Sequence, residues 1–123
     1  MGLKILIVED EQIVAADLQG KLKRMGHHVV ATAASGDEAI RFAQDLRPEL
    51  VLMDIQLEGD MLGTEAALRV QKITGAPVIF ITAYAETFVA DPAQMRPPGL
   101  CLSKPFSTYQ LQAVLDVVVD KRT

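Results

Sequence analysis

Short apolar runs alternate along the chain with longer segments in which apolar residues recur at helical spacing. The short runs are rich in Val, Ile and Leu and predict strands at residues 4–8, 29–33, 50–53, 78–82 and 99–102. The run over 50–53 is unbroken, which is typical of a central strand covered on both faces. Five repeats of strand followed by helix predict an α/β fold, with one parallel sheet and helices on both of its faces.

The ends of the predicted helices carry recognisable signals. The first helix, over residues 12–25, is followed by Gly26, a typical C-terminal stop. Ser35 with Glu38 three residues later has the form of a capping box before the second helix. A third helix is predicted over residues 63–73.

The last two predicted helices differ in regularity. Residues 84–95 contain Pro92, and Pro97 and Pro98 follow, so we expect the fourth helix to be short or irregular. Ser107 and Gln110 repeat the capping pattern before a final helix with apolar residues at helical spacing.

Charged residues stand directly after three of the predicted strands. Glu9 and Asp10 follow the first strand, Asp54 follows the third and Lys104 follows the fifth. In a flavodoxin-like, doubly wound sheet of order 2-1-3-4-5, strands one and three are neighbours, so the carboxylates of Asp10 and Asp54 can share one cation. We expect Mg2+, which prefers oxygen ligands, while Lys104 and the hydroxyl of Thr82 should flank Asp54.

Composition narrows the class of protein. The 123 residues, half of them hydrophobic, suit one domain over residues 1–123 without an effector domain. The net charge of −4, without a basic stripe, disfavours nucleic acid as a direct ligand. The six-residue apolar run near the N-terminus is too short for a signal peptide or membrane span, so we expect a cytoplasmic protein without membrane contact.

Two residue types that can carry chemistry, cysteine and histidine, have simpler interpretations here. Cys101 is the single cysteine, which agrees with a reducing compartment, and we expect it to be a small buried hydrophobic residue. His27 and His28 fall in a predicted turn and are interpreted as solvated loop residues.

Four segments together resemble a known family. ILIVEDE, LVLMDIQL, PVIFITAYA and LCLSKPF are similar, in order and spacing, to the receiver domain of two-component response regulators. The resemblance covers residues 3 to about 121. It implies a phosphoprotein of signal transduction that takes a phosphoryl group from a sensor histidine kinase or a histidine phosphotransfer protein and signals to a downstream protein.

The resemblance also implies a role for each acidic residue. Asp54 matches the phosphoacceptor, which attacks the phosphorus of a phosphohistidine and becomes an acyl phosphate. Asp10, the Asp54 carboxylate and the backbone carbonyl of Gln56 would hold Mg2+, with Glu9 in the outer shell. The domain would catalyse its own phosphoryl transfer and dephosphorylation, and it would not be an enzyme in any further sense.

Other positions of the family pattern concern the switch. Lys104 and Thr82 would contact phosphoryl oxygens, and the peptide before Pro105 is expected to be cis. Cys101 stands where relatives carry Tyr or Phe. This departure puts the usual coupling of Thr82 to an inward-turning aromatic ring in doubt. Tyr84 lies where relatives tune phosphate lifetime, and we expect its ring to shield Asp54 from water.

Several other classes fit the sequence less well. A flavodoxin needs a hydroxyl- and glycine-rich phosphate loop where this chain has residues 9–11, all acidic. A topoisomerase-primase-type domain needs a second aspartate where Gln56 stands, and a haloacid-dehalogenase-type phosphatase needs one two residues after Asp10. The remaining alternative is a degenerate receiver that binds its partner without phosphorylation.

Overall fold

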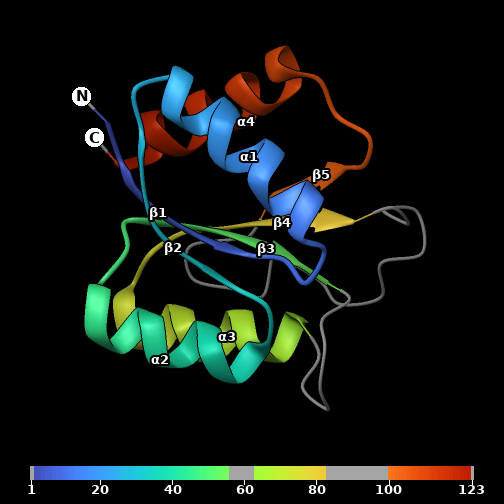
Figure 1. The fold of residues 1–123 in the computed structure, drawn as a ribbon. Coiled ribbons are helices and arrows are strands. Elements are labelled where there is room, and N and C mark those ends of the chain that lie inside the picture. Colours follow the sequence, from blue (N-terminus) through green and yellow to red (C-terminus); the bar gives the residue numbers. More distant parts are fainter. Residues whose placement is uncertain (1, 56–62, 83–99, 123) are drawn as a thin grey trace.

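The computed structural model describes residues 2–55, 63–82 and 100–122 (Figure 1). Five parallel strands form one sheet in the order β2-β1-β3-β4-β5, as the flavodoxin-like prediction requires. The strands are β1 (Lys4–Val8), β2 (His28–Ala33), β3 (Leu50–Asp54), β4 (Val78–Thr82) and β5 (Leu100–Ser103). Because β3 lies at the centre, between β1 and β4, its whole length is buried.

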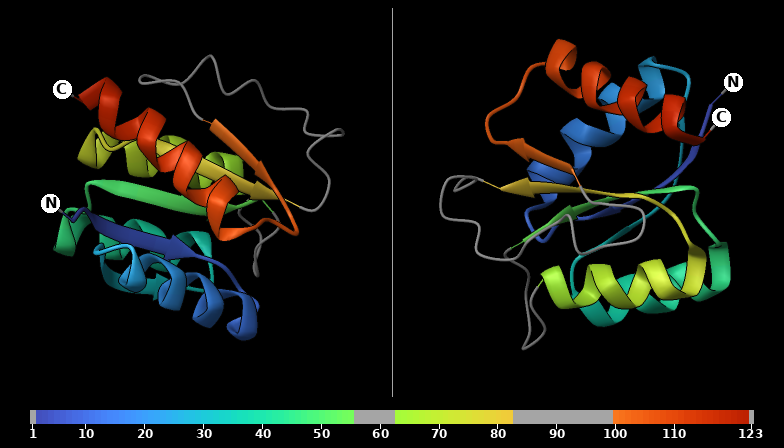
Figure 2. Two further views of the ribbon diagram at one scale, coloured as in Figure 1. Left: turned by 90° about the horizontal axis from the view of Figure 1, so that it is seen from above. Right: turned by 180° about the vertical axis from the view of Figure 1, so that it is seen from behind.

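The helices form a layer on each face of the sheet. The described helices are α1 (Gln12–Arg24), α2 (Gly36–Leu46), α3 (Gly63–Thr74) and α4 (Thr108–Arg122). α1 and α4 cover one face, and α2 and α3 cover the other, as the views in Figures 1 and 2 agree. No helix in the described ranges is long and apolar enough to cross a membrane. The predicted short helix at residues 84–95 lies outside these ranges.

Alternating side chains of the strands divide the core into two clusters. Ile5 and Ile7 of β1 belong to the cluster beneath α1 and α4, whereas Leu6 and Val8 belong to the one beneath α2 and α3. All four are at most 1% exposed. Burying a side chain of this size stabilises a fold by about 1.5–3 kcal/mol, so the two clusters hold the sheet rigidly between its helices.

The capping residues that the sequence predicted make the expected hydrogen bonds in the structure. The Oγ atom of Ser35 accepts a hydrogen bond from the N–H of Glu38 (3.2 Å), and Glu38 Oε1 accepts one from the N–H of Ala34 (2.9 Å). The N–H of Gln110 likewise donates to Ser107 Oγ at 3.1 Å. These contacts satisfy backbone groups that have no partner within the helix, and the sequence pattern therefore placed both helix starts correctly.

Two interpretations of single residues are wrong. Cys101 is exposed, because β5 is an edge strand and the residue that faces the core there is Leu102. His27 is partly buried, and its Nδ1 accepts a hydrogen bond from the N–H of Leu3 at 3.0 Å. It therefore links the turn after α1 to the beginning of β1, while His28 is exposed at the start of β2.

Candidate functional site

The carboxyl ends of four strands bring the predicted site residues to one edge of the sheet. Parallel pairing sets Val8 beside Met53, so Glu9 and Asp10 emerge next to Asp54, the last residue of β3. The same register places Asp54 beside Ile81 of β4. β5 follows on the other side of β4 and delivers Lys104.

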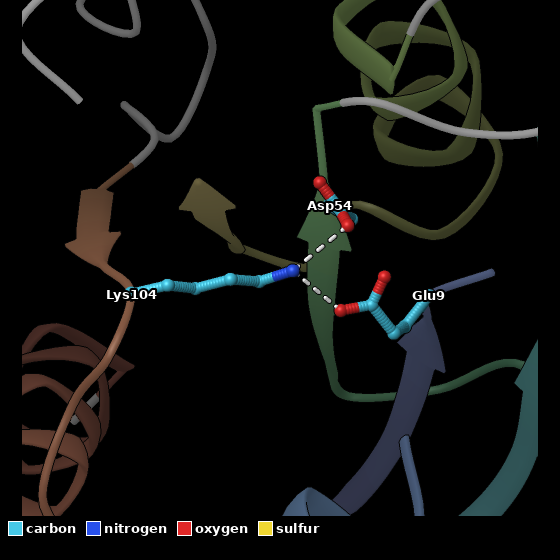
Figure 3. A network of polar contacts seen from close by, with 3 residues as sticks. All are labelled: Glu9, Asp54 and Lys104. Atoms are coloured by element: carbon cyan, nitrogen blue, oxygen red, sulfur yellow. Dashed lines mark hydrogen bonds and ion pairs between the residues drawn. The ribbon is translucent and has the colours of Figure 1, made fainter. Parts of the chain in front are cut away.

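Lys104 bridges two carboxylates from different strands. Its Nζ lies 2.6 Å from Glu9 Oε1 and 3.0 Å from Asp54 Oδ2 (Figure 3). The side chain reaches past β4 to do so, and the peptide between Lys104 and Pro105 is cis, as the family resemblance implied. The prediction that Lys104 flanks Asp54 is confirmed in geometry, whereas its contact with Glu9 was not foreseen.

The three ionisable side chains of this network are shielded from water. The Glu9 side chain is 1% exposed, that of Asp54 7% and that of Lys104 18%. Burial, followed by the interaction with the Asp54 carboxyl group, raises the pKa of Glu9 to about 8, although Lys104 opposes this shift. Burial alone would lower the pKa of Lys104, but its hydrogen bonds to Glu9 and Asp54 prevail and raise it. Lys104 therefore remains a cation.

Glu9, Asp10 and Asp54 also form a cluster that fits a metal ion. One carboxylate oxygen from each residue lies within 4.8 Å of the others, and such hard oxygen ligands suit Mg2+. Glu9 Oε2 is buried without a hydrogen-bond partner among the described residues. A buried oxygen of this kind is costly unless something compensates it, and a cation at the cluster would do so.

A cleft of about 450 Å³ lies beside two of the three acids of this cluster. It runs between α1 and the connection from β2 to α2, and both Glu9 and Asp10 line it. Small side chains, among them Ala15, Ala16 and Ala33, keep the cleft open. Asp10 is only half-buried, so an ion can approach Asp10 from this side.

The other predicted site residues divide into two groups. Thr82 is the last residue of β4, paired with Ser103 of β5, so its backbone stands at the same edge of the sheet. Gln56 and Tyr84 lie outside the described residues. The pairing of Glu9 with Lys104 was missed because sequence spacing shows which strand ends meet but not which of two adjacent acids faces a given lysine.

The comparisons with known proteins agree on one family. The family model described as the response regulator receiver domain matches residues 5–116. The phyllosphere-induced regulator PhyR of Methylorubrum extorquens is 38% identical over 116 residues, which are 94% of this chain and 43% of that protein. The chain spans about half the length of the curated relatives it matches.

Two solved structures extend the comparison. The anti-anti-sigma factor PhyR from Bartonella quintana matches with a TM-score of 0.85 and 29% identity, covering 99% of this chain and 49% of that one. The receiver domain of a sensor histidine kinase from Pseudomonas aeruginosa matches with a TM-score of 0.80 and 28% identity, covering 98% and 99%. That structure holds a magnesium ion in its active-site cleft. With its fold, strand-end residues and sequence in agreement, this chain belongs to the response regulator receiver domain family.

Proposed function

We propose that this chain is the phosphoacceptor of a two-component phosphorelay, with Asp54 as the residue that is phosphorylated. The observation that carries the proposal is the environment of Asp54: the carboxylate ends a buried central strand, contacts Lys104 and belongs to a cluster of three acids. A structural aspartate at a strand end needs neither a buried lysine nor two acidic neighbours. A group that must gain and lose a phosphate needs both positive charge and a metal ion nearby.

In the proposed reaction a carboxylate oxygen of Asp54 attacks the phosphorus of a phosphohistidine on the partner. The new O–P bond forms as the P–N bond breaks, and the electron pair of that bond returns to the imidazole, which takes up a proton. Water later attacks the acyl phosphate, releases inorganic phosphate and restores the carboxylate of Asp54. The domain would catalyse these two steps on itself and no other reaction.

The surrounding residues have separate tasks in this proposal. Asp10 and Asp54, together with the backbone carbonyl of Gln56, would hold Mg2+, and Glu9 would stand in the outer shell. When bound, Mg2+ supplies positive charge that offsets the repulsion among carboxylates and phosphoryl oxygens. The Lys104 ammonium would move from the carboxylate to a phosphoryl oxygen.

Signalling would follow from the same exchange of contacts. Thr82 would approach the phosphoryl group and bias the domain towards its active conformation. Reversing a ratio of about 99:1 between two conformations requires roughly 5.5 kcal/mol, which a few charge-assisted hydrogen bonds can supply. The exposed Cys101 cannot act as the aromatic switch of relatives, so we propose that the output here does not depend on an inward-turning ring at this position.

The proposed partners are proteins. A sensor histidine kinase or a histidine phosphotransfer protein would donate the phosphoryl group in the cytoplasm, and a downstream protein would receive the signal. The description of the Bartonella relative as an anti-anti-sigma factor supports a protein target for the output. The net charge of −4 supports the same choice over nucleic acid.

Intact mass spectrometry tests the phosphoacceptor directly. The chain is incubated with acetyl phosphate or phosphoramidate, with and without Mg2+, beside an Asp54→Asn variant. We expect a gain of one phosphoryl group that requires both Mg2+ and Asp54. A folded parent that binds Mg2+ and gains no phosphoryl group would refute the proposal, and it would favour a receiver that binds its partner without phosphorylation.

A further inference from the structure

Gly63 occupies an unusual place beside the candidate phosphoacceptor. It is the first residue of α3 and is buried. Its N–H donates a hydrogen bond to the carbonyl oxygen of Ile55 at 3.1 Å. The first turn of α3 therefore lies directly on the backbone that leaves β3 after Asp54.

The space at Gly63 is filled by backbone atoms. A Cβ atom added there would lie 2.3 Å from the carbonyl oxygen of Asp54, 2.7 Å from Ile55 Cα and 2.8 Å from the Ile55 carbonyl oxygen. Real Cβ atoms essentially never approach other atoms this closely. Gly63 is not among the glycines with positive φ, so the requirement for glycine here is one of space and not of backbone conformation.

The surroundings determine what would move if a side chain were present. α3 is fixed to the core through Ala66, Ala67 and Val70, which are completely buried. A packed core resists displacement of a whole helix. The backbone after Asp54 leaves the sheet at Ile55, whose N–H donates to the carbonyl of Ile81 and whose carbonyl accepts from the N–H of Gly63. The peptides of Asp54 and Ile55 should therefore shift before α3 does.

We propose that Gly63 is a positioning residue for the metal and phosphoacceptor site. The absence of a side chain lets α3 press on the carbonyl groups of Asp54 and Ile55. This contact fixes the Asp54 carboxylate relative to Glu9 and Asp10. The inference rests on the proposed function, in which Asp54 and the carbonyl of Gln56 hold Mg2+.

The test compares Gly63→Ala with Val70→Ala. Val70 lies on the same helix, is fully buried and stands seven residues after Gly63, so its truncation weakens packing about two helical turns from Gly63. Mg2+ affinity is measured by titration calorimetry at a temperature where both variants are folded. We expect Gly63→Ala to lose about 10- to 100-fold in affinity, as when a residue that orients metal ligands is changed, and Val70→Ala to match the parent.

A second measurement follows the backbone without metal. The carbonyl carbon chemical shifts of Asp54 and Ile55 should change in metal-free Gly63→Ala and stay at parent values in Val70→Ala. Where Gly63→Ala is poorly folded, it is combined with Gly20→Ala, because a Cβ at Gly20 meets only the flexible end of Arg24 at 3.3 Å. Gly is a poor helix residue, so this background should be more stable than the parent.

The outcomes separate this inference from the proposed function. Parent-like Mg2+ affinity in Gly63→Ala would overturn the positioning role and leave the phosphoacceptor intact. Failure of the combined variant to fold would also overturn it, since Gly63 would then be a requirement of the fold alone. A parent that binds Mg2+ but takes no phosphoryl group would refute the proposed function and leave the role of Gly63 standing.

Discussion

Lys104 holds together two carboxylates that are buried at the ends of different strands. Lys104→Met keeps the apolar stem but removes the ammonium, which leaves Glu9 and Asp54 without their cation. Breaking a buried ion pair in this way is strongly destabilising, and we expect the free energy of unfolding without Mg2+ to fall by about 3 kcal/mol. Urea denaturation of the metal-free protein measures this loss.

The matched control for this prediction is Lys72→Met, which removes an exposed lysine of α3. It should change the free energy of unfolding by less than about 0.5 kcal/mol, as exposed charges usually do. Mg2+ should also stabilise Lys104→Met more than the parent, because the ammonium no longer competes for the carboxylates. Equal losses of unfolding free energy in Lys104→Met and Lys72→Met would contradict the proposal that the buried network stabilises the fold.

His27 should make the stability of the fold depend on pH. Burial lowers the pKa of His27 below the ordinary value of 6.5, and the neutral ring accepts a hydrogen bond from the N–H of Leu3. The unfolded chain therefore binds this proton more readily than the folded one. The contribution to stability is complete above about pH 6.5 and is lost as the pH falls through the lowered folded-state pKa.

The measurement is the free energy of unfolding in urea between about pH 7.5 and pH 5.5, above the range in which ordinary carboxylates titrate. His27→Asn is the control, since an amide oxygen can accept the bond from the N–H of Leu3 without titrating. Glu9, with a pKa of about 8, takes up a proton in both proteins over this range, so the difference between them reports His27. We expect acidification to lower the stability of the parent relative to that of His27→Asn. Identical slopes would show that this histidine does not titrate differently in the two states.

Single residues show where sequence reasoning succeeds and fails. The meeting of Asp10, Asp54 and Lys104 follows from strand order alone, because parallel strands bring their carboxyl ends to one edge. The bond between Lys104 and Glu9 depends on side-chain direction after a strand has ended, which no periodicity fixes. The burial of His27 and the exposure of Cys101 were missed for a related reason: each depends on tertiary neighbours.

At the scale of elements, capping residues determine where helices begin. Ser35→Ala removes the acceptor for the N–H of Glu38, and we expect it to lower the free energy of unfolding by about 1 kcal/mol. Ser35→Gly should cost only a few tenths of a kcal/mol, because glycine suits this position better than alanine. Urea denaturation of the parent and the two variants measures these values, and a Ser35→Ala variant as stable as the parent would show that the hydroxyl is not a significant cap.

Predicted and observed elements agree because local signals and packing act together. Gly26, with φ of 89°, lies just after the end of α1, where the sequence predicted that the helix would stop. α2 ends at Leu46, followed by Arg47 in the left-handed conformation, which the sequence pattern did not predict. Arg47 NH1 donates to the carbonyl of Ile73 at 2.6 Å, a contact from α2 to α3 that only the folded arrangement creates.

At the scale of the whole molecule, the order of the strands in the sheet brings the residues of the site together. The chain visits β3 after β2, yet β3 pairs with β1, so residues separated by more than forty positions meet at one edge. Alternation of strand and helix predicted this crossover, and the unbroken apolar run of β3 predicted its central place. The close approach of Gly63 to Asp54 could not be predicted, because it depends on how α3 is seated on the sheet.

The central claim is that Asp54 itself carries the phosphoryl group, and chemical trapping tests it most directly. The chain is treated with acetyl phosphate and Mg2+, reduced with borohydride, which converts an aspartyl phosphate to homoserine, and mapped by peptide mass spectrometry. We predict homoserine at Asp54, with Glu9 and Asp10 unchanged. Reduction at either of these two acids instead, or at none of the three in a folded protein that binds Mg2+, would contradict the account.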